Sequence, residues 1–286
     1  MRYCGRDFSE SDMASIRAII ADHPAARRAE LSRLVCEALD WRSPGDRLKD
    51  MSCRVAMLRM QKDGHIQLPV PRQSNGNGKP YLRRTLWAEP TVFPSFACAG
   101  DIADLHLQLT SRDQSHLWNE YIDRYHYLGY QPLPGAQLRY MAWAQGQVVA
   151  LLGFGAAAWT TAPRDRWIGW TSAQRASHLH LVINNARFLI LPWVNCRNLA
   201  SRILGMAVRR LALDWHHCYG YRPVLAETFV EISRFRGTCY KAANWTCMGE
   251  TQGIGKLGTY KLQVPKKTVW TYPLVANFRE HLCAAD

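Results

Sequence analysis

The feature that most constrains how this chain folds is the stretch 187–215, RFLILPWVNCRNLASRILGMAVRRLALDW. Its apolar run, residues 188–194, is too short for an average helix and is rich in Leu and Ile, so it predicts a strand buried on both faces of a sheet. Pro192 cannot donate a hydrogen bond to a neighbouring strand, so we expect an edge, a bulge or a splay at that point.

A helix follows this strand. Asn195 or Asn198 supplies its cap, and Arg202, Arg209 and Arg210 fall on its outward side. The inward side chains are Leu199, Ile203, Leu204, Ala207, Val208, Leu211 and Trp215. A broken strand end before a helix start presents free backbone N–H groups and the positive end of the helix dipole, which suit a phosphate or carboxylate. The stretch therefore predicts an anion-binding opening in a sheet.

Length and charge limit the class of protein. With 286 residues, 48% of them hydrophobic, the chain suffices for one large domain or two smaller ones with a real core. Its formal net charge of +13 predicts attraction to polyanions, to nucleic acid before an anionic membrane surface. The alternative is a solvated basic surface without a polyanionic partner.

The sequence has neither an apolar leader nor an apolar run of the ~20 residues that span a bilayer. We therefore expect a cytoplasmic protein without membrane contact. Its nine cysteines are scattered and form no CxxC pair, which is typical of reduced thiols.

The N-terminal part has the pattern of three short helices. Ser9 or Ser11 caps the first, the second follows Pro24, and the third covers residues 49–63. We expect the third helix to bury four apolar side chains and to turn its basic residues outward. The four apolar residues are Met51, Val55, Leu58 and Met60.

Residues 65–70 alternate and predict a short strand, which a basic stretch at 79–84 follows. Three helices, a strand and a basic loop are the order of a winged helix-turn-helix, whose third helix enters the major groove of DNA. The alternative is a helical bundle that packs on the rest of the chain and binds nothing. The predicted DNA-binding residues are Lys49, Arg54, Arg59, Lys62, Arg83 and Arg84, with Lys256 and Lys261 from a Gly-rich basic loop that lacks a P-loop motif.

The composition predicts a winged-helix-like domain over residues 1–75, a linker rich in Pro, Gly and Asn over 76–92, and a larger domain over 93–286. The larger domain has the order of an α+β or α/β fold, with the long helix crossing between parallel strands. Its further expected elements are helices at 110–127 and 236–243, strands at 138–144 and 147–154 joined by a Gln145-Gly146 hairpin, and strands at 167–170, 177–183, 223–231 and 245–249.

The phrases VVALLGFG, RFLILPWVNCRNLASRILG, PVLAETFVE and GTCYKAANWTCMGET, in this order, resemble the GCN5-related N-acetyltransferase fold. This resemblance implies a mixed sheet whose fourth and fifth strands splay to admit the pantetheine of acetyl-CoA. The residues at that place are Leu191, Trp193, Asn195, Asn198, Ala200 and Ser201. The chain lacks the glycines of the superfamily's pyrophosphate loop, so the ligand stays open between acetyl-CoA, another acyl or aminoacyl donor, a nucleotide and none.

A second resemblance covers nearly the whole chain. The motifs YHYLGY, DRWIGW, NNARFLILPWV, NLAS, ETFV, GTCYKAANW and GETQGIGK are similar to those of the DruA family of the Druantia anti-phage defence system and of a related domain in transposon-associated proteins. The resemblance implies a DNA-directed role in defence or in a mobile element. The expected partners are DNA and a helicase or other subunits of a defence complex.

Four residues are candidates for catalysis. Glu227 shares a strand face with Leu225 and Phe229, so we expect it to be half buried, with a raised pKa that suits a general base. An ion pair with an arginine such as Arg187 is the alternative. The acetyltransferase resemblance implies that Tyr240 is a general acid, and simple packing is the alternative.

Asp214 lies near a helix C-terminus, where an anion is disfavoured, so it needs either an ion-pair partner or a functional role. His126, between Tyr125 and Tyr127, is a candidate base or a ring on which a nucleobase stacks. Ordinary packing explains this aromatic cluster equally well.

His178 and His180 would share one face of a strand and hold a divalent metal, as in His-hydrophobic-His nickases, if a third ligand and a nucleophilic Tyr were near. The leading hypothesis is a DNA-binding protein of defence or transposon origin with an acetyltransferase-like cleft. The alternatives are an acyl or aminoacyl transferase acting on nucleic acid or protein, a metal-dependent nickase, and a structural subunit of a defence complex.

Overall fold

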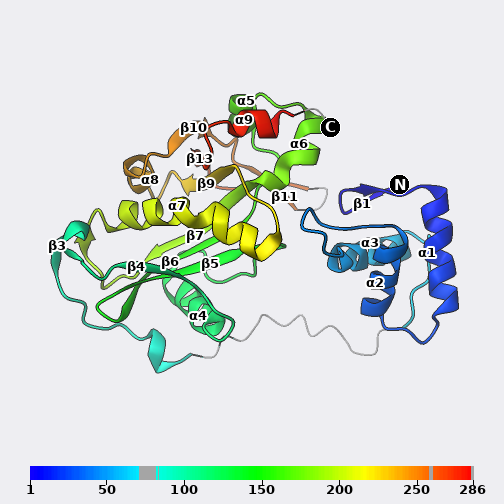
Figure 1. Cartoon of the computed structure of the whole chain (residues 1–286), viewed down its shortest axis with the longest axis horizontal. Helices are drawn as coiled ribbons and strands as arrows, with labels where there is room; N and C mark the ends of the chain where they lie inside the picture. The colour runs from blue at the N-terminus through cyan, green and yellow to red at the C-terminus, as the bar shows by residue number, and fades with distance from the viewer. Residues whose placement is uncertain (71–81, 83, 258–259, 285–286) are drawn as a thin grey trace. The chain divides into compact units, whose positions relative to one another are not determined.

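The computed structural model describes residues 1–70, 82, 84–257 and 260–284, without the side chains of residues 255–261 (Figure 1). The chain divides into two compact units, residues 1–80 with 219–221, and residues 81–218 with 222–286. We call the first unit the head and the second unit the body.

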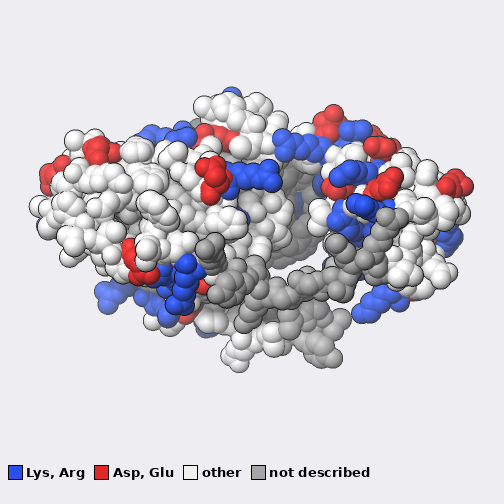
Figure 2. Space-filling model, turned by 90° about the horizontal axis from the view of Figure 1, so that it is seen from below, with Lys and Arg blue, Asp and Glu red and all other residues white. Residues whose placement is uncertain are grey.

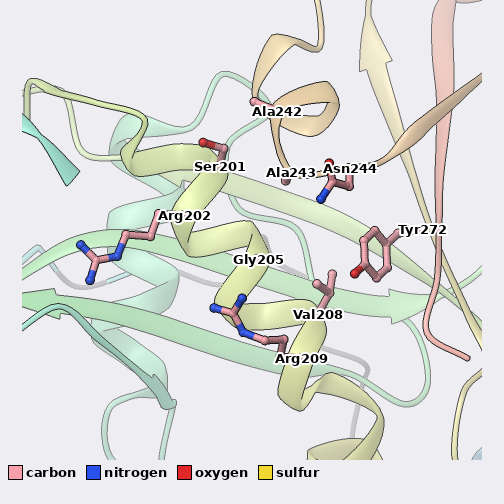
Figure 3. A pocket seen from close by; sticks show the side chains of 9 residues that line it. All are labelled: Ser201, Arg202, Gly205, Val208, Arg209, Ala242, Ala243, Asn244 and Tyr272. Atoms are coloured by element: carbon pink, nitrogen blue, oxygen red, sulfur yellow. The ribbon is translucent and has the colours of Figure 1, made fainter. Parts of the chain in front are cut away.

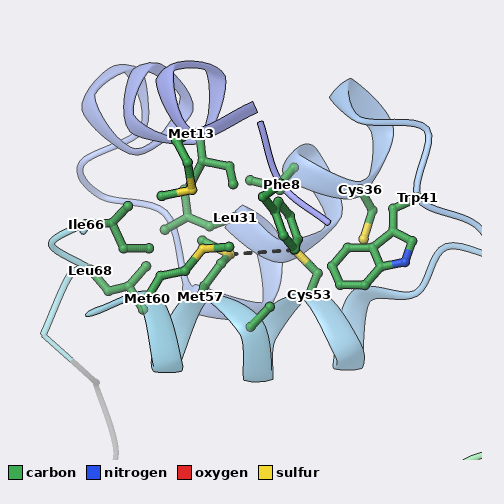
Figure 4. Close-up of a cluster of buried hydrophobic side chains, with 13 residues drawn as sticks. Phe8, Met13, Leu31, Cys36, Trp41, Cys53, Met57, Met60, Ile66 and Leu68 are labelled. Carbon is green, nitrogen blue, oxygen red and sulfur yellow. Dashed lines mark hydrogen bonds between the residues drawn. The ribbon is translucent and has the colours of Figure 1, made fainter. Parts of the chain in front are cut away.

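The head is a bundle of three helices, α1 (Glu10–Asp22), α2 (Arg28–Ala38) and α3 (Asp50–Lys62), preceded by a hairpin of β1 (Arg2–Tyr3) and β2 (Arg6–Asp7). Ser9 caps α1 in a capping box with Asp12, as its position predicts. The core lies between the helices (Figure 4) and contains Phe8, Met13, Ile16, Leu31, Val35, Cys36, Trp41, Cys53, Ala56, Met57, Met60, Ile66 and Leu68.

The expected inward face of α3 is correct for Met60 and wrong for the other three residues, which lie on nearly the opposite side of the helix from the buried stripe. Cys53, Met57 and Met60 face the core, whereas Met51 is 60% exposed and Val55 and Leu58 are each 38% exposed. Both sets have the spacing i, i+4, i+7, so periodicity alone does not choose between them. The outward face of α3 is therefore partly apolar.

The strand expected over residues 65–70 is absent, since these described residues form no ladder, although Ile66 and Leu68 are buried. Carbonyl groups in this segment accept bonds from arginine side chains instead. Arg17 bonds the His65 carbonyl at 3.0 Å, and Arg28 bonds the Pro69 carbonyl at 3.0 Å. The three predicted helices are confirmed, and the wing strand is wrong.

Among the described residues of the body, seven strands form one sheet in the order β10-β13-β9-β7-β6-β5-β4. β7 and β9 run parallel, and the other neighbours in this sheet run antiparallel. The strands are β4 (His106–Leu109), β5 (Leu138–Ala144), β6 (Gln147–Ala156), β7 (Val182–Ile190), β9 (Leu225–Glu231), β10 (Thr246–Glu250) and β13 (Lys267–Pro273).

Two small ladders accompany the large sheet. β3 (Phe96–Cys98) pairs with β8 (Cys196–Arg197), and β11 (Ile254–Leu257) pairs with β12 (Tyr260–Gln263). The body's helices are η1 (Leu86–Ala88), η2 (Ala99–Asp101), α4 (Ser115–Tyr125), α5 (Ala162–Ile168), α6 (Ser172–His178), η3 (Leu179–Leu181), α7 (Leu199–Tyr219), α8 (Thr238–Ala242) and α9 (Phe278–Leu282).

The stretch 187–215 folds largely as predicted. The strand ends at Ile190, before Pro192, and the inward residues expected for the helix are all buried on α7. The helix crosses from β7 to the parallel strand β9 (Figure 1). The predicted hairpin between β5 and β6 is also confirmed, with Gln145 and Gly146 at positive φ.

Three other expectations need correction, and one strand was not expected. Residues 167–170 are not a strand, because α5 continues to Ile168 and ends at Gly169 with φ 86°. His178 ends α6 and His180 lies in η3, so the two histidines do not share a strand face. The strand expected from residue 177 begins only at residue 182, after these turns. β13 is an interior strand of the sheet that the sequence interpretation missed.

Part of the predicted linker belongs to the body. The main chain of η1 is bonded to α4, since the Tyr121 hydroxyl donates to the Trp87 carbonyl at 2.7 Å and the Tyr125 hydroxyl to the Ala88 carbonyl at 2.8 Å. Glu120 accepts the Thr85 N–H at 2.7 Å. The body therefore begins before residue 93.

None of the helices in the described ranges combines the length and the apolar character that a membrane crossing requires. All nine cysteines lie within these ranges and are free thiols in the structure.

Candidate functional site

The sheet of the body opens between β7 and β9. These two strands pair only from Val182 opposite Leu225 to Asn184 opposite Glu227, and beyond this point they have no common ladder. A bulge at Ala186 interrupts the pairing of β7 with β6 on its other side. Counted from β4, the two strands stand fourth and fifth, so the splay lies where the acetyltransferase resemblance implies it.

Three buried polar side chains fill the start of this opening. The Tyr240 hydroxyl of α8 donates to the Asn185 amide oxygen at 2.8 Å, and the Thr228 hydroxyl donates to the Asn185 carbonyl at 3.0 Å. All three residues are buried, and burial raises the pKa of Tyr240. The Tyr240 hydroxyl proton, which a general acid would donate to the substrate, is therefore held in a hydrogen bond to Asn185.

Glu227 lies on the opposite face of the sheet from Thr228, because successive residues of a strand alternate. Its carboxylate pairs with Arg164 of α5 at 2.8 Å and accepts the Ala158 N–H at 2.9 Å. Both charged side chains are fully buried, and burial is the main cause that raises the Glu227 pKa. The partner arginine is Arg164 and not Arg187, and the fold does not bring Glu227 and Tyr240 to one site.

Asp214 on α7 has the ion-pair partner that its position calls for. It accepts Nε of Arg210 at 2.6 Å and the Tyr140 hydroxyl at 2.8 Å. Burial and Asp214 together raise the pKa of Tyr140. These contacts account for the carboxylate at this place without a ligand.

His126 is buried at the carboxyl end of α4. Its Nδ1 accepts the Leu128 N–H at 3.2 Å, and its ring stacks on Tyr127 at 4.9 Å. Burial, with a smaller contribution from Arg187, lowers the His126 pKa to about 4. His126 is therefore neutral near pH 7.

A groove of about 350 Å³ lies between α7 and α8 (Figure 3). No Asp or Glu is among its described lining residues. The lining consists of Ser201, Arg202, Gly205, Val208 and Arg209 from α7, Ala242, Ala243 and Asn244 from α8 and its end, and Tyr272 from β13.

The two arginines of this groove are held differently. Arg202 points away from the groove and donates to the carbonyls of Ala99 and Ile102 (Figure 3). Arg209 is exposed, and its Nη1 lies 3.8 Å from the position that a Cβ of Gly205 would take. A glycine inside a helix costs about 1 kcal/mol relative to alanine. Here Gly205 leaves this wall of the groove without a side chain.

Of the residues predicted to hold a cofactor, Ser201 lines the groove and the other five do not. Leu191 is buried, Trp193 packs edge-on against Tyr125 at 5.0 Å, and Asn198 turns its amide toward Cys98. Asn195 is exposed, and Ala200 is half buried. The pairing of β8 with β3 draws the segment before α7 away from the groove.

These residues do not fit acetyl-CoA in the way the resemblance implies. The segment before α7 lacks glycine and is held in a ladder, and the start of the splay is filled by Asn185, Thr228 and Tyr240. The groove itself offers one exposed cation, Arg209. The arrangement suits a phosphate or another small anion better than it suits acyl transfer.

The predicted DNA-binding residues of the head are mostly exposed, as for Lys49, Arg59 and Lys62, while Arg54 is half buried and pairs with Asp50 at 3.6 Å. Arg84 of the body is also exposed. Arg83 and the side chains of Lys256 and Lys261 lie outside the described residues.

Residues 1–70, the described part of the N-terminal segment of the head, carry little net charge. Residues 1–70 contain 12 of the 36 Lys and Arg and 10 of the 23 Asp and Glu, a net charge of +2 out of +13. On the face drawn in Figure 2, basic and acidic side chains of the head are interspersed. Most of the positive charge therefore lies beyond residue 70.

No group of three His, Cys, Asp or Glu side chains that would hold a metal occurs within the described ranges. The strand geometry expected for His178 and His180 is absent as well, because one residue ends a helix and the other lies in a turn. The geometry that the nickase hypothesis requires is therefore absent from the described residues.

The model of one protein family, Druantia protein DruA, matches residues 60–263. The chain belongs to the DruA family. No curated protein matches it. The DruA match begins in the last turn of α3 and ends with β12, so the splay, His126 and every lining residue of the groove except Tyr272 lie within the family region.

Solved structures similar to this DruA-family chain are acetyltransferases. Aminoglycoside acetyltransferase AAC(6')-Ib in complex with coenzyme A is 14% identical, with 59% of this chain and 95% of that chain covered and a TM-score of 0.41. A spermidine N-acetyltransferase chimera of Vibrio cholerae SpeG and hSSAT is 10% identical over 60% and 96%, with a TM-score of 0.41. Drosophila melanogaster polyamine N-acetyltransferase is 12% identical over 59% and 100%, with a TM-score of 0.38.

Three features of the DruA-family body escaped the sequence interpretation. Gly205 interrupts an otherwise regular helix pattern, and this glycine is the signal that would have indicated the groove. The Ala186 bulge and the Arg164 partner of Glu227 have no comparable signal, because they depend on the register of β7 and on the packing of α5.

Proposed function

We propose that this DruA-family protein binds DNA in a Druantia defence system, and that the groove between α7 and α8 holds a backbone phosphate. The observation that carries the proposal is a groove with an exposed Arg209 and no carboxylate among its described lining residues. Cations without a nearby anion attract the phosphates of nucleic acid.

The polar groups around Arg209 support a phosphate rather than a bare halide. Asn244 and Tyr272 project toward α7 across the groove (Figure 3). An amide N–H and a phenol O–H both donate to phosphate oxygens, and such contacts set the position of a protein on DNA. Lys241, exposed on α8 beside Ala242, adds positive charge next to this rim.

In this proposal the head is a second and weaker contact with a winged-helix-like role. Lys49, Arg59 and Lys62 are exposed on or beside α3 and are placed to contact phosphates. The net charge of residues 1–70 is only +2, so we assign the head a smaller share of the electrostatic free energy of binding.

The proposal is tested by fluorescence anisotropy with a labelled duplex between about 50 and 200 mM salt. The logarithm of the wild-type association constant should fall linearly with the logarithm of the salt concentration. Arg209→Gln should reduce the magnitude of that slope by about 0.9, the value for one lost phosphate contact. Arg166→Gln is the matched control, because Arg166 is an exposed arginine on α5 and does not line the groove.

Filling the groove gives a second test. Gly205→Leu places a branched side chain in the groove and should weaken binding, whereas Gly205→Ala should bind like wild type, since the nearest atom to its Cβ is 3.8 Å away. Absence of duplex binding at the lowest salt, or binding that salt does not change, would overturn the proposed function. Equal effects of Arg209→Gln and Arg166→Gln would overturn the assignment to the groove.

A further inference from the structure

A second surface of the body combines exposed rings with cations, and we call it the aromatic–arginine patch. It consists of Tyr127, Leu128, Arg187, Arg234 and Phe235. These residues follow the end of α4, lie at the bulge of β7 and follow the end of β9, so they gather where the two splayed strands end. The patch shares no residue with the groove between α7 and α8.

The rings of the patch are accessible. Tyr127 is 38% exposed and Phe235 is 50% exposed, with ring centroids 5.4 Å apart and planes tilted by 58°. The guanidinium carbon of Arg234 lies 4.8 Å from the centre of the Tyr127 ring. An accessible ring beside a cation on an otherwise solvated loop is typical of a stacking surface for nucleic acid bases.

Arg187 adds an unsatisfied positive charge. Its Nη1 donates to the Ala186 carbonyl at 2.8 Å, its Nε is buried without a hydrogen-bond partner, and no described carboxylate forms an ion pair with it. Burial also lowers the Arg187 pKa. A half-buried guanidinium without an anion is unfavourable, so this arrangement favours an anion supplied by a ligand.

Nearby acidic charge does not neutralise the patch. Glu231 at the end of β9 is close enough to Tyr127 to raise its pKa, although burial is the larger cause. The Glu231 carboxylate accepts the Ser233 hydroxyl at 2.9 Å. Arg234 and Arg236, both exposed on the loop after β9, exceed this single negative charge.

We infer that the aromatic–arginine patch binds an unpaired nucleotide of single-stranded nucleic acid. The base stacks on Phe235 or Tyr127, and Arg187 pairs with the adjoining phosphate. An unpaired base is required because the face of a base inside a duplex is covered by its stacked neighbours. This inference rests on the proposed function and extends it from duplex to single strands.

The test compares two substitutions of one residue in the full chain. Phe235→Leu removes the ring but keeps an apolar side chain, and Phe235→Trp keeps an aromatic face. Binding is measured with an oligothymidylate of about 10 nucleotides that carries one 2-aminopurine, whose fluorescence is quenched by stacking. Phe235→Leu should lose roughly 5- to 100-fold in affinity and most of the quenching, and Phe235→Trp should retain both.

Duplex binding separates the two proposals. Phe235→Leu should bind the duplex as wild type does, whereas Arg209→Gln should weaken duplex binding. Arg187→Met should lower the salt slope for the single strand by about 0.7, the value for one phosphate contact on a single strand. If wild type binds duplex but no single strand, or if Phe235→Leu leaves single-strand affinity unchanged, the inference is wrong while the proposed function stands. If wild type binds neither nucleic acid, both are wrong.

Discussion

Arg164 and Arg209 belong to the same unit of this protein and are held in opposite ways. Arg164 is fully buried on α5 and touches two carboxylates, Asp165 at 2.7 Å and Glu227 at 2.8 Å. Arg209 is exposed on α7, in a groove without a described carboxylate. One arginine has its counter-charge within the fold, and the other meets solvent.

The difference separates charges that hold the fold from charges available to a ligand. A buried arginine whose carboxylates are in place has no capacity left for a phosphate, and its removal acts on stability. An exposed arginine contributes little to stability, and its removal acts on binding. Sequence alone does not sort the two, since both lie in segments rich in Arg.

The sharpest test of this comparison is the substitution Glu227→Gln. It leaves the buried Arg164 with Asp165 as its remaining carboxylate, so we expect the free energy of unfolding to fall by about 3–5 kcal/mol. Chemical denaturation followed by tryptophan fluorescence measures the change, with Trp118 and Trp215 buried in the body as reporters.

The control for Glu227 removes both charges. Arg164→Met combined with Glu227→Leu should recover most of the lost stability, because replacing a buried pair with apolar side chains is often neutral or stabilising. A stable Glu227→Gln protein that has lost a chemical activity would contradict the comparison and would favour the predicted general base.

A smaller loss is expected for Tyr240→Phe. The substitution leaves the Asn185 amide oxygen without its donor inside the splay, which costs about 1–3 kcal/mol. Tyr272→Phe is the matched control, because Tyr272 is only partly buried at the groove, and it should change stability by less than about 0.5 kcal/mol. Equal unfolding midpoints for the two variants would contradict the distinction between a hydroxyl that is bonded inside the splay and a hydroxyl that lies at the groove.

The parts of the fold that followed from the sequence are those set by local pattern. The inward face of α7, the strand end before Pro192 and the hairpin at Gln145-Gly146 depend on periodicity and on turn chemistry, which are written in consecutive residues. β13 also has such a pattern, since Thr268, Trp270 and Tyr272 alternate along it, but the interpretation passed over it.

The parts that did not follow depend on contacts between distant segments. The face of α3 is ambiguous because Met51 and Cys53 begin equivalent apolar stripes, and only packing against α1 and α2 decides between them. The partner of Glu227 is likewise set by α5, 63 residues away along the chain, a helix that the sequence interpretation did not predict. The sequence therefore indicated which residues are candidates more reliably than it indicated the side chains to which they bond.

The last expected effect appears only at low pH and concerns His126, which lies beside the unpaired Arg187. Its pKa is about 4 in the folded protein and 6.5 in the absence of structure, so the unfolded chain binds more protons between these values. The stability that comes from neutral His126 is complete above about pH 6.5 and is lost as the pH falls toward about 4. The loss amounts to at most about 1.4 kcal/mol for each pH unit.

Denaturation curves of wild type and His126→Asn at several pH values between about 4 and 6.5 measure this effect. Asparagine does not titrate, and its amide oxygen takes the place of Nδ1 as acceptor of the Leu128 N–H. The difference between the two proteins should grow in favour of the variant as the pH falls. A constant difference would mean that His126 titrates in the folded protein as it does in the unfolded chain, and that Arg187 does not oppose a positive charge on His126.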